Sequence, residues 1–504
     1  MGHVGGWPRN LVKGGSVPAM RELSLRALRD FPYRNKTLEA EPVAPVDRAW
    51  LRMDEPENLM QVTGVLVLDR FLPLQEAQGL LAERLKGVPR FSDRVERDER
   101  GYFWVRRESL DLENQVVEEE LSPPGGPNEL AEAVGRWMSA PLTRVRPLWE
   151  IRLLQGFEGS KTVLLCRLHH AIGDGVALMV VLLALTDPPE AENGERGDPP
   201  ANQEPRTSTE SSTENPFLAL LRERSQELLA VASQQVARWM PETYRLMTAP
   251  VEAYARLSAG ARQLAAAGSL SRLALRSADP PSPFKGSLGI DKRVAWTEPV
   301  ALEELRRRAR SLDVSLNELL NTAMVGAMRR YLVAQRSVSA SFAVRCAMPV
   351  NLRPLKEMSA LGNRFGLIFL PLPLGIEESM SRLYQLREQA RALRHSAEPL
   401  VVLGLLDLAG RLPEAGQQLL VKLFGAKATA VFTNVPGPRA PLTFAKRRIS
   451  EIFFWVPQAG RLGLGVSIFS YAGKVRMGVA TDAGLVPDPE RLVEGFHREL
   501  ESLL

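Results

Sequence analysis

The chain has 504 residues, of which 45% are hydrophobic and 24% charged, a composition typical of folded globular proteins. This length accommodates two or three domains with substantial cores. The formal net charge of +5 is small for such a chain, which argues against dedicated nucleic-acid binding and permits weak attraction to anionic lipid. The two cysteines, Cys166 and Cys346, stand in apolar runs and are expected to be reduced core residues of a cytoplasmic protein.

Residues 1–40 are interpreted as a basic, disordered extension without a hydrophobic signal core. No apolar run is as long as a membrane span. Residues 41–186 are expected to form the first folded half. Within this half the hydrophobic pattern predicts strands and helices in the order strand 61–68, helix 74–85, strand 101–105 and helix 128–138.

The most informative stretch of this half is 164–175, LLCRLHHAIGDG. A buried strand is predicted to end in His169 and His170, and a turn of small residues then leads through Asp174 and Gly175 into a helix. A neutral imidazole can accept the proton of a hydroxyl group as its oxygen attacks, so the pair holds a candidate general base. A purely structural interpretation stays open, in which the histidines are buried polar residues and Asp174 caps the helix.

A metal site is not expected in this motif. Adjacent side chains on a strand point in different directions, and no third His or Cys stands at ligand spacing. A metal-dependent hydrolase is therefore disfavoured.

Residues 187–215 contain no large apolar side chain and are predicted to be a disordered acidic linker, because they cannot bury enough surface to offset the entropy of ordering. Residues 216–280 are predicted to form amphipathic, arginine-rich connecting helices. Two interpretations compete for them. The helices either pack on the core with their arginines in solvent, or lie on a membrane or lipid droplet with the arginines on phosphates.

Residues 281–504 are expected to form the second half. Ser315 and Glu318 have the spacing of a capping box that begins a helix running to Leu332. Asn317 lies in the first turn, where its amide is either exposed or directed into a site. The other predicted elements are strands at 293–296, 341–350, 367–374 and 429–433, helices at 302–310, 377–394, 400–412 and 488–504, and a hairpin over 462–481.

Seven segments along the chain carry a resemblance to a known family. They are Pro147-Leu148-Trp149, the segment His169 to Gly175, Asn317, Pro349-Val350-Asn351-Leu352-Arg353, Gly362-Asn363-Arg364, Asn434-Val435-Pro436-Gly437-Pro438 and Ser470-Tyr471-Ala472-Gly473. In this order they resemble the bacterial wax ester synthase/diacylglycerol acyltransferases, which are CoA-dependent acyltransferases of the chloramphenicol acetyltransferase type. The chain departs from the family pattern at Glu318, where other members carry aspartate, and in its N-terminal extension and long acidic linker.

The resemblance implies an α/β fold of two chloramphenicol acetyltransferase-like halves, each a mixed sheet with flanking helices, with an active-site tunnel between them. It implies direct transfer of a long-chain acyl group from acyl-CoA to diacylglycerol, giving triacylglycerol, or to a long-chain alcohol, giving wax ester. Acyl-CoA is then a substrate, and no bound cofactor is expected. The enzyme is expected in the cytoplasm, peripherally attached to the inner membrane or to lipid inclusions.

The resemblance also suggests roles for individual residues. His170 is the predicted base, while His169 shapes the pocket. Asp174 is structural and pairs with Arg353. Asn317 is the candidate donor to the oxyanion. The remaining motif residues are given structural roles: Pro147, Leu148, Trp149, Gly175 and Asn434. Two alternatives stay open, namely a condensation-type enzyme that uses the same histidine motif to form amides or esters, and a non-catalytic lipid-droplet-associated protein.

Overall fold

The structure is a computed structural model that describes residues 40–85, 88, 90–107, 110–187, 258–335, 339, 341–353, 361–394, 396–458 and 460–504. Residues 1–39 of the predicted N-terminal extension, all but the first residue of the acidic linker, and residues 216–257 of the predicted connecting helices lie outside the described residues. The last residue of the predicted extension, Ala40, begins a strand.

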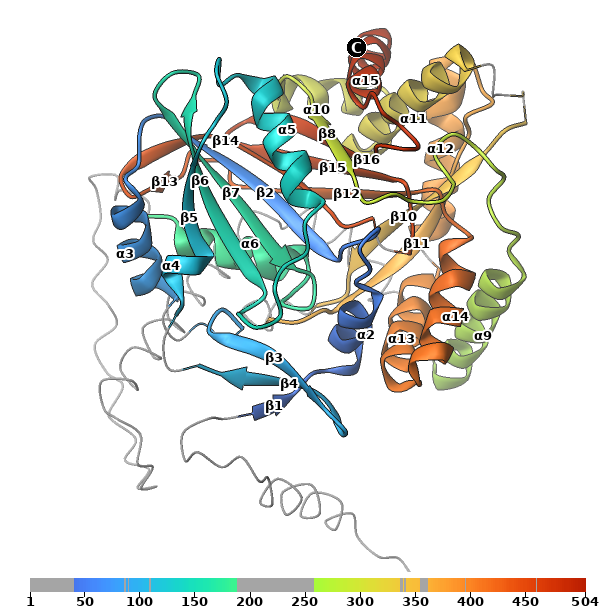
Figure 1. The fold of residues 1–504 in the computed structure, drawn as a ribbon. Helices are drawn as coiled ribbons and strands as arrows, with labels where there is room; N and C mark the ends of the chain where they lie inside the picture. Colours follow the sequence, from blue (N-terminus) through green and yellow to red (C-terminus); the bar gives the residue numbers. More distant parts are fainter. Residues whose placement is uncertain are drawn as a thin grey trace, which may run out of the picture. The chain divides into compact units, whose positions relative to one another are not determined.

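The first half is built on a six-stranded sheet with the order β13-β14-β2-β7-β6-β5 (Figure 1). Its strands are β2 (Gln61–Leu68), β5 (Val116–Glu120), β6 (Trp149–Phe157), β7 (Lys161–His169), β13 (Thr443–Phe444) and β14 (Arg447–Trp455). Two of these strands come from the second half of the sequence, since β14 pairs antiparallel with β2. The sequence pattern did not predict this exchange.

The second half contains a seven-stranded sheet with the order β11-β10-β12-β15-β16-β8, and β9 also pairs with β16. Its strands are β8 (Lys292–Trp296), β9 (Val300–Ala301), β10 (Val344–Asn351), β11 (Phe365–Leu372), β12 (Ala430–Pro436), β15 (Leu464–Tyr471) and β16 (Lys474–Asp482). β12 runs parallel to β10 and β15, whereas the other pairs are antiparallel. The prediction of two halves, each with a mixed sheet, is confirmed. A small third sheet has the order β1-β4-β3, from β1 (Ala40–Pro42), β3 (Asp93–Asp98) and β4 (Gly101–Arg106).

Helices cover these sheets (Figure 1). In chain order they are α2 (Pro45–Met53), α3 (Leu74–Leu85), α4 (Leu112–Gln115), α5 (Pro127–Met138), α6 (Gly175–Leu185), α9 (Ala259–Leu275), α10 (Leu302–Ser311), α11 (Leu316–Ala334), α12 (Ser379–Arg394), α13 (Glu398–Arg411), α14 (Glu414–Gly425) and α15 (Glu490–Leu503). None of the helices in the described ranges is long and apolar enough to cross a bilayer.

The central helix of the second half, α11, begins at the predicted capping box. The Glu318 amide donates to Ser315 Oγ at 3.2 Å, and the Ser315 amide donates to Glu318 Oε2 at 2.7 Å. Much of the helix is buried in the second hydrophobic core. Asn317 is thereby fixed at the first turn of a helix whose position the core determines.

Helix α2 is held against α13 by a close approach of their backbones. A Cβ atom added to Gly410 on α13 would lie only 1.7 Å from the carbonyl oxygen of Pro45 on α2, so only glycine fits at this contact. Arg52 of α2 also donates to the carbonyl oxygen of Leu412 at 2.8 Å. These contacts fix the position of α2, which carries the side chains of Asp47 and Trp50 toward the histidine motif.

Candidate active site

The histidine motif forms a tight turn between β7 and α6. The His170 amide donates to the carbonyl oxygen of Met60 at 2.7 Å, and the Ile172 amide donates to the carbonyl oxygen of His169 at 3.0 Å. Gly173 then pairs with Gly362 of the second half, whose amide donates to the Ile172 carbonyl at 2.9 Å. The strand end is thus joined by backbone hydrogen bonds to the loop before β11.

Asp174 holds this turn together through both carboxylate oxygens. Oδ1 accepts from the Ala177 amide at 3.0 Å, which is the predicted N-cap of α6. Oδ2 accepts from Arg353 Nη2 at 2.9 Å and from the Arg364 amide at 3.0 Å. Only 5% of the Asp174 side chain and 3% of the Arg353 side chain are exposed, so this is a buried ion pair. The pair expected from the family resemblance is present, and its geometry is that of a structural support.

His170 lies in a largely apolar environment at the same turn. Its ring stacks on Trp50 with centroids 4.2 Å apart and also contacts Phe365 at 5.6 Å. Its Nδ1 atom lies 2.9 Å from Oδ1 of Asn363. Burial lowers the pKa of His170 from 6.5 to about 4, with the carboxylate of Asp174 opposing the shift. The imidazole is therefore neutral at pH 7 and able to accept a proton.

His169 has a different environment from its neighbour. Its Nδ1 atom accepts a hydrogen bond from the Ala171 amide at 3.0 Å, and its Nε2 atom lies 3.7 Å from Oδ2 of Asp54. Its side chain is buried and does not line the cavity beside His170. The two rings therefore have different roles: His169 stabilises the turn, whereas His170 lines the cavity.

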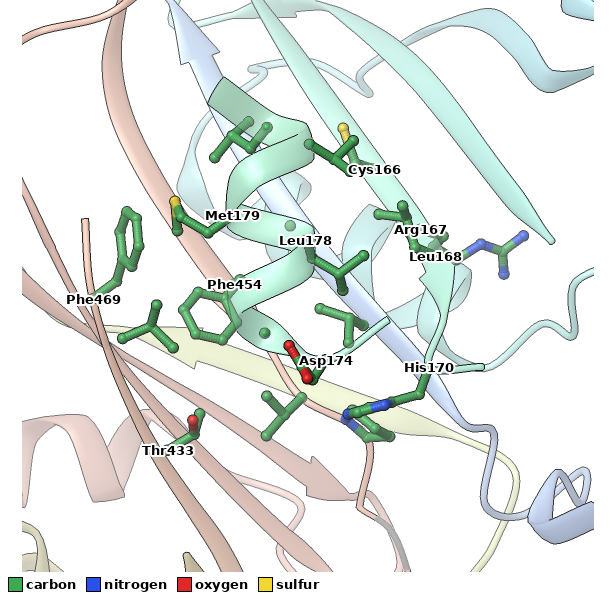
Figure 2. A pocket seen from close by; sticks show the side chains of 18 of the residues that line it. Cys166, Arg167, Leu168, His170, Asp174, Leu178, Met179, Thr433, Phe454 and Phe469 are labelled. Atoms are coloured by element: carbon green, nitrogen blue, oxygen red, sulfur yellow. The ribbon is translucent and has the colours of Figure 1, made fainter. Parts of the chain in front are cut away.

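A cavity of about 240 Å³ lies between the two sheets, and His170 is part of its wall (Figure 2). Strand β7, helix α6 and the two sheets supply walls that are mainly aliphatic and aromatic; they include Cys166, Leu178, Met179, Leu182, Phe454 and Phe469. The polar groups in the wall include His170, Asp174, Thr433 and Asn434, together with the paired Glu150 and Arg167. Such a cavity suits a long apolar chain whose reacting end lies beside His170.

The remaining predicted motif residues mainly support this cavity. Trp149 begins β6 with 1% of its surface exposed, and its Nε1 atom donates to the carbonyl oxygen of Phe91 at 2.8 Å, as expected for a packing anchor. Asn434 lies in the cavity wall and donates through Nδ2 to Oδ1 of Asn317, which is not among the lining residues. The role of Asn317 as oxyanion donor stays a prediction.

The thiol of Cys166 lines the cavity, but burial raises its pKa to about 12, which makes it a poor nucleophile at neutral pH. Within the described part of the chain, no group of three or more His, Cys, Asp or Glu side chains is arranged to hold a metal ion.

Three residues at this site were not singled out from the sequence: Asp47, Trp50 and Asn363. The segment Gly362-Asn363-Arg364 was recognised only as a family match, without a role. Asp47 and Trp50 are more than 100 residues before the histidines in the sequence, and no local pattern connects them to the motif. Their position depends on how α2 packs against α13.

Comparison with known proteins gives a consistent result over almost the whole described chain. Residues 43–320 match the model of the wax ester synthase/diacylglycerol acyltransferase catalytic domain, and residues 361–504 match the WS/DGAT C-terminal domain. The chain belongs to the wax ester synthase/diacylglycerol acyltransferase family. It is an acyl-CoA-dependent O-acyltransferase.

Relatives of this WS/DGAT-family protein include a putative diacylglycerol O-acyltransferase of Mycobacterium bovis, 26% identical over 470 residues that cover 91% of this chain and 95% of the relative. A probable diacylglycerol O-acyltransferase of Mycobacterium tuberculosis matches with the same figures. Among solved structures, the wax ester synthase/diacylglycerol acyltransferase of Marinobacter aquaeolei VT8 has a TM-score of 0.62 at 21% identity, covering 92% of this chain and 98% of that one. A trichothecene 15-O-acetyltransferase of Fusarium sporotrichioides shares the fold, with a TM-score of 0.59, 10% identity and coverage of 92% and 95%.

Proposed function

We propose that the protein transfers a long-chain acyl group from acyl-CoA to the hydroxyl group of diacylglycerol or of a long-chain alcohol, with His170 as the general base. The observation that carries this proposal is a buried imidazole, stacked on Trp50, in the wall of an apolar cavity between two sheets. This burial lowers the pKa of His170, which favours the neutral ring that a base requires. The named relatives support a glyceride acceptor, and the Marinobacter neighbour supports a fatty alcohol as well.

In the proposed reaction, Nε2 of His170 takes the hydroxyl proton as the alcohol oxygen attacks the thioester carbonyl carbon. A tetrahedral oxyanion forms, and its collapse breaks the carbon–sulfur bond. The imidazolium then returns its proton to the leaving CoA thiolate, so the base is regenerated. No acyl-enzyme is formed, which agrees with the unreactive Cys166 thiol at the cavity wall.

The tetrahedral oxyanion needs a hydrogen-bond donor, and one positioned donor is typically worth about 2.7–4 kcal/mol. The pair of Asn434 and Asn317 is the candidate. Asn434 lines the cavity, and its amide is oriented by Asn317 at the start of α11. We therefore assign Asn317 an indirect contribution through Asn434.

The helices α9, α13 and α14 are called the helical layer here (Figure 1). We propose that this layer contacts a lipid surface, from which the hydrophobic substrates enter the protein. On α9, Leu264 and Leu275 are 77% and 86% exposed. They are eleven residues apart and share one face of the helix. On α14, Leu419 and Leu423 are 68% and 47% exposed and lie four residues apart. An amphipathic layer of this kind binds at the interface by burying leucine side chains among the acyl chains.

The activity is tested by offering palmitoyl-CoA with diacylglycerol, with hexadecanol, or with both in competition, and by following free CoA and the lipid product. The natural chain is expected to form triacylglycerol, wax ester or both, and the ratio of products identifies the preferred acceptor. His170→Ala, with an unchanged thermal transition, is expected to lose transfer by ~10²–10⁴-fold. Equal CoA release by the two proteins contradicts the assignment of the base, and no release from any alcohol contradicts the proposed function.

A further inference from the structure

The orientation of the Asn363 amide is fixed by what surrounds it. Its Nδ2 atom lies 2.8 Å from Oδ1 of Asp47 and 2.7 Å from the carbonyl oxygen of His170. The same Asp47 oxygen accepts a hydrogen bond from the Asn363 backbone amide at 3.1 Å, so it is the acceptor for both the backbone and the side chain of Asn363. Since a carbonyl oxygen can only accept, the NH₂ group of Asn363 must face these two oxygens, and its Oδ1 atom must face His170.

This orientation determines the protonation of the His170 ring. Asn363 Oδ1 lies 2.9 Å from Nδ1 of His170, and an amide oxygen cannot donate a hydrogen bond. The Nδ1 atom must therefore carry the ring's proton. A neutral imidazole has only one such proton, so its Nε2 atom keeps a free lone pair.

We propose that Asp47 and Asn363 are positioning residues that hold His170 in the tautomer with an unprotonated Nε2 atom. This inference rests on the proposed role of His170 as the base and extends it. Asp47 and His170 belong to the region that matches the catalytic domain, whereas Asn363 belongs to the C-terminal region. The base of the first half is thus oriented by a side chain of the second half.

The surroundings make this chain of contacts rigid. About 5% of Asp47 and 9% of His170 are exposed. Gly362 adopts a positive φ of 94°, and a Cβ atom there would lie 3.3 Å from Oδ2 of Asp47, so the loop passes directly over the carboxylate. Both the backbone amide and the side chain of Asn363 are held by the same oxygen of Asp47. Few other orientations of the Asn363 amide satisfy all of these groups.

The kinetic test compares Asn363→Ala with Gln417→Ala. Gln417 is a matched control, because it is another buried amide that donates to α2, at 2.8 Å from the Ala49 carbonyl oxygen, without contacting His170. Loss of the correct tautomer is expected to lower kcat by ~10²-fold or more in Asn363→Ala, with a small change in KM. Asp47→Ala is expected to lower kcat in the same way, and Asp47→Asn, which keeps an acceptor oxygen, to restore most of it.

The direct test is ¹⁵N–¹H NMR of the full chain labelled in its five histidines, with the His170 signals assigned by their absence in His170→Ala. The inference predicts a protonated Nδ1 and an unprotonated Nε2 in the natural protein, and a mixture of tautomers in Asn363→Ala. A proton on Nε2 in the natural protein overturns it, as does a kcat of Asn363→Ala within twofold of that of Gln417→Ala. Because the tautomer is measured without turnover, a chain that transfers no acyl group but shows Nδ1–H rejects the proposed function and leaves this inference standing.

Discussion

The turn that carries His170 and the layer of α9, α13 and α14 are built on opposite principles. At the turn, charged and polar groups are buried and paired, as in Asp174 with Arg353, and a Cβ atom added to Gly173 would lie only 2.9 Å from the Cβ atom of Ala177. In the helical layer, leucines such as Leu264 and Leu275 are largely exposed with respect to the residues that the structure describes. The contrast agrees with the two proposed tasks, because chemistry needs fixed geometry whereas the proposed contact with a lipid surface needs exposed apolar side chains.

The two regions are connected through α13. Helix α13 contacts α2 at Gly410. It also packs against α9, where Leu273 is fully buried. Helix α2 then brings Trp50 onto the ring of His170. The following changes are expected to affect one region without the other, beginning with the largest effect.

Asp174→Ala is expected to lower the free energy of unfolding by about 3–5 kcal/mol, because it removes the carboxylate that compensates the charge of the buried Arg353 guanidinium. The matched control is Asp407→Ala, which breaks the exposed pair with Arg411 on α13 and should cost less than about 1 kcal/mol. Urea denaturation measures both. Equal costs for the two substitutions would contradict the structural role given to Asp174.

Gly410→Ala is expected to cost about 1–3 kcal/mol, since the added methyl group collides with the Pro45 carbonyl and pushes α2 away. Because α2 carries Asp47 and Trp50, kcat should fall as well. Gly404→Ala on the same helix has nothing within 4 Å of the new Cβ atom and should stabilise the protein by up to about 1 kcal/mol. Thermal unfolding and steady-state kinetics of the two variants measure these effects. An unchanged kcat in Gly410→Ala would contradict the claim that the α13–α2 contact positions the site.

Leu264→Ser and Leu419→Ser are each expected to weaken binding to phospholipid vesicles by about tenfold, because each removes one leucine from the proposed interface. Transfer between short-chain acyl-CoA and a water-soluble alcohol should not change. Ile290→Ser, which replaces an apolar side chain that is 53% exposed before β8, is the control and should bind vesicles like the natural chain. Vesicle sedimentation measures all three, and equal binding by all of them would refute the lipid-facing layer.

The sequence predicted much of the fold because long periodic segments carry most of the signal. The strand at β2 and the helix at α3 agree with the predicted ranges, and the capping box of α11 is present. Strand β14 was not among the predicted elements. Its place in the first sheet could not be predicted either, since no local pattern specifies which of two sheets a strand joins. Helix α14 was also missed, because it follows Pro413 immediately and its leucines are exposed.

The motif residues themselves were recognisable, but the contacts that control them were not. Asp174 as N-cap follows from the spacing of a turn and a helix. By contrast, Asn363 meets His170 across 193 positions of sequence, and Asp47 meets Asn363 across 316. Such contacts depend on the tertiary packing of both halves, which one sequence does not specify locally.

The most direct test of the account is the pH dependence of kcat/KM for acyl transfer by the natural chain. Burial lowers the pKa of His170 to about 4, and the ring acts as a base only when it is unprotonated. The rate should therefore be constant from neutral pH down to about pH 5 and should fall below it, with full recovery when the protein is returned to pH 7. Burial also raises the pKa of Asp47 to about 6, so Asp47→Asn, in which position 47 does not titrate, is the control. A half-maximal rate near pH 6.5, the ordinary pKa of an exposed imidazole, in both proteins would contradict a buried neutral His170 as the base.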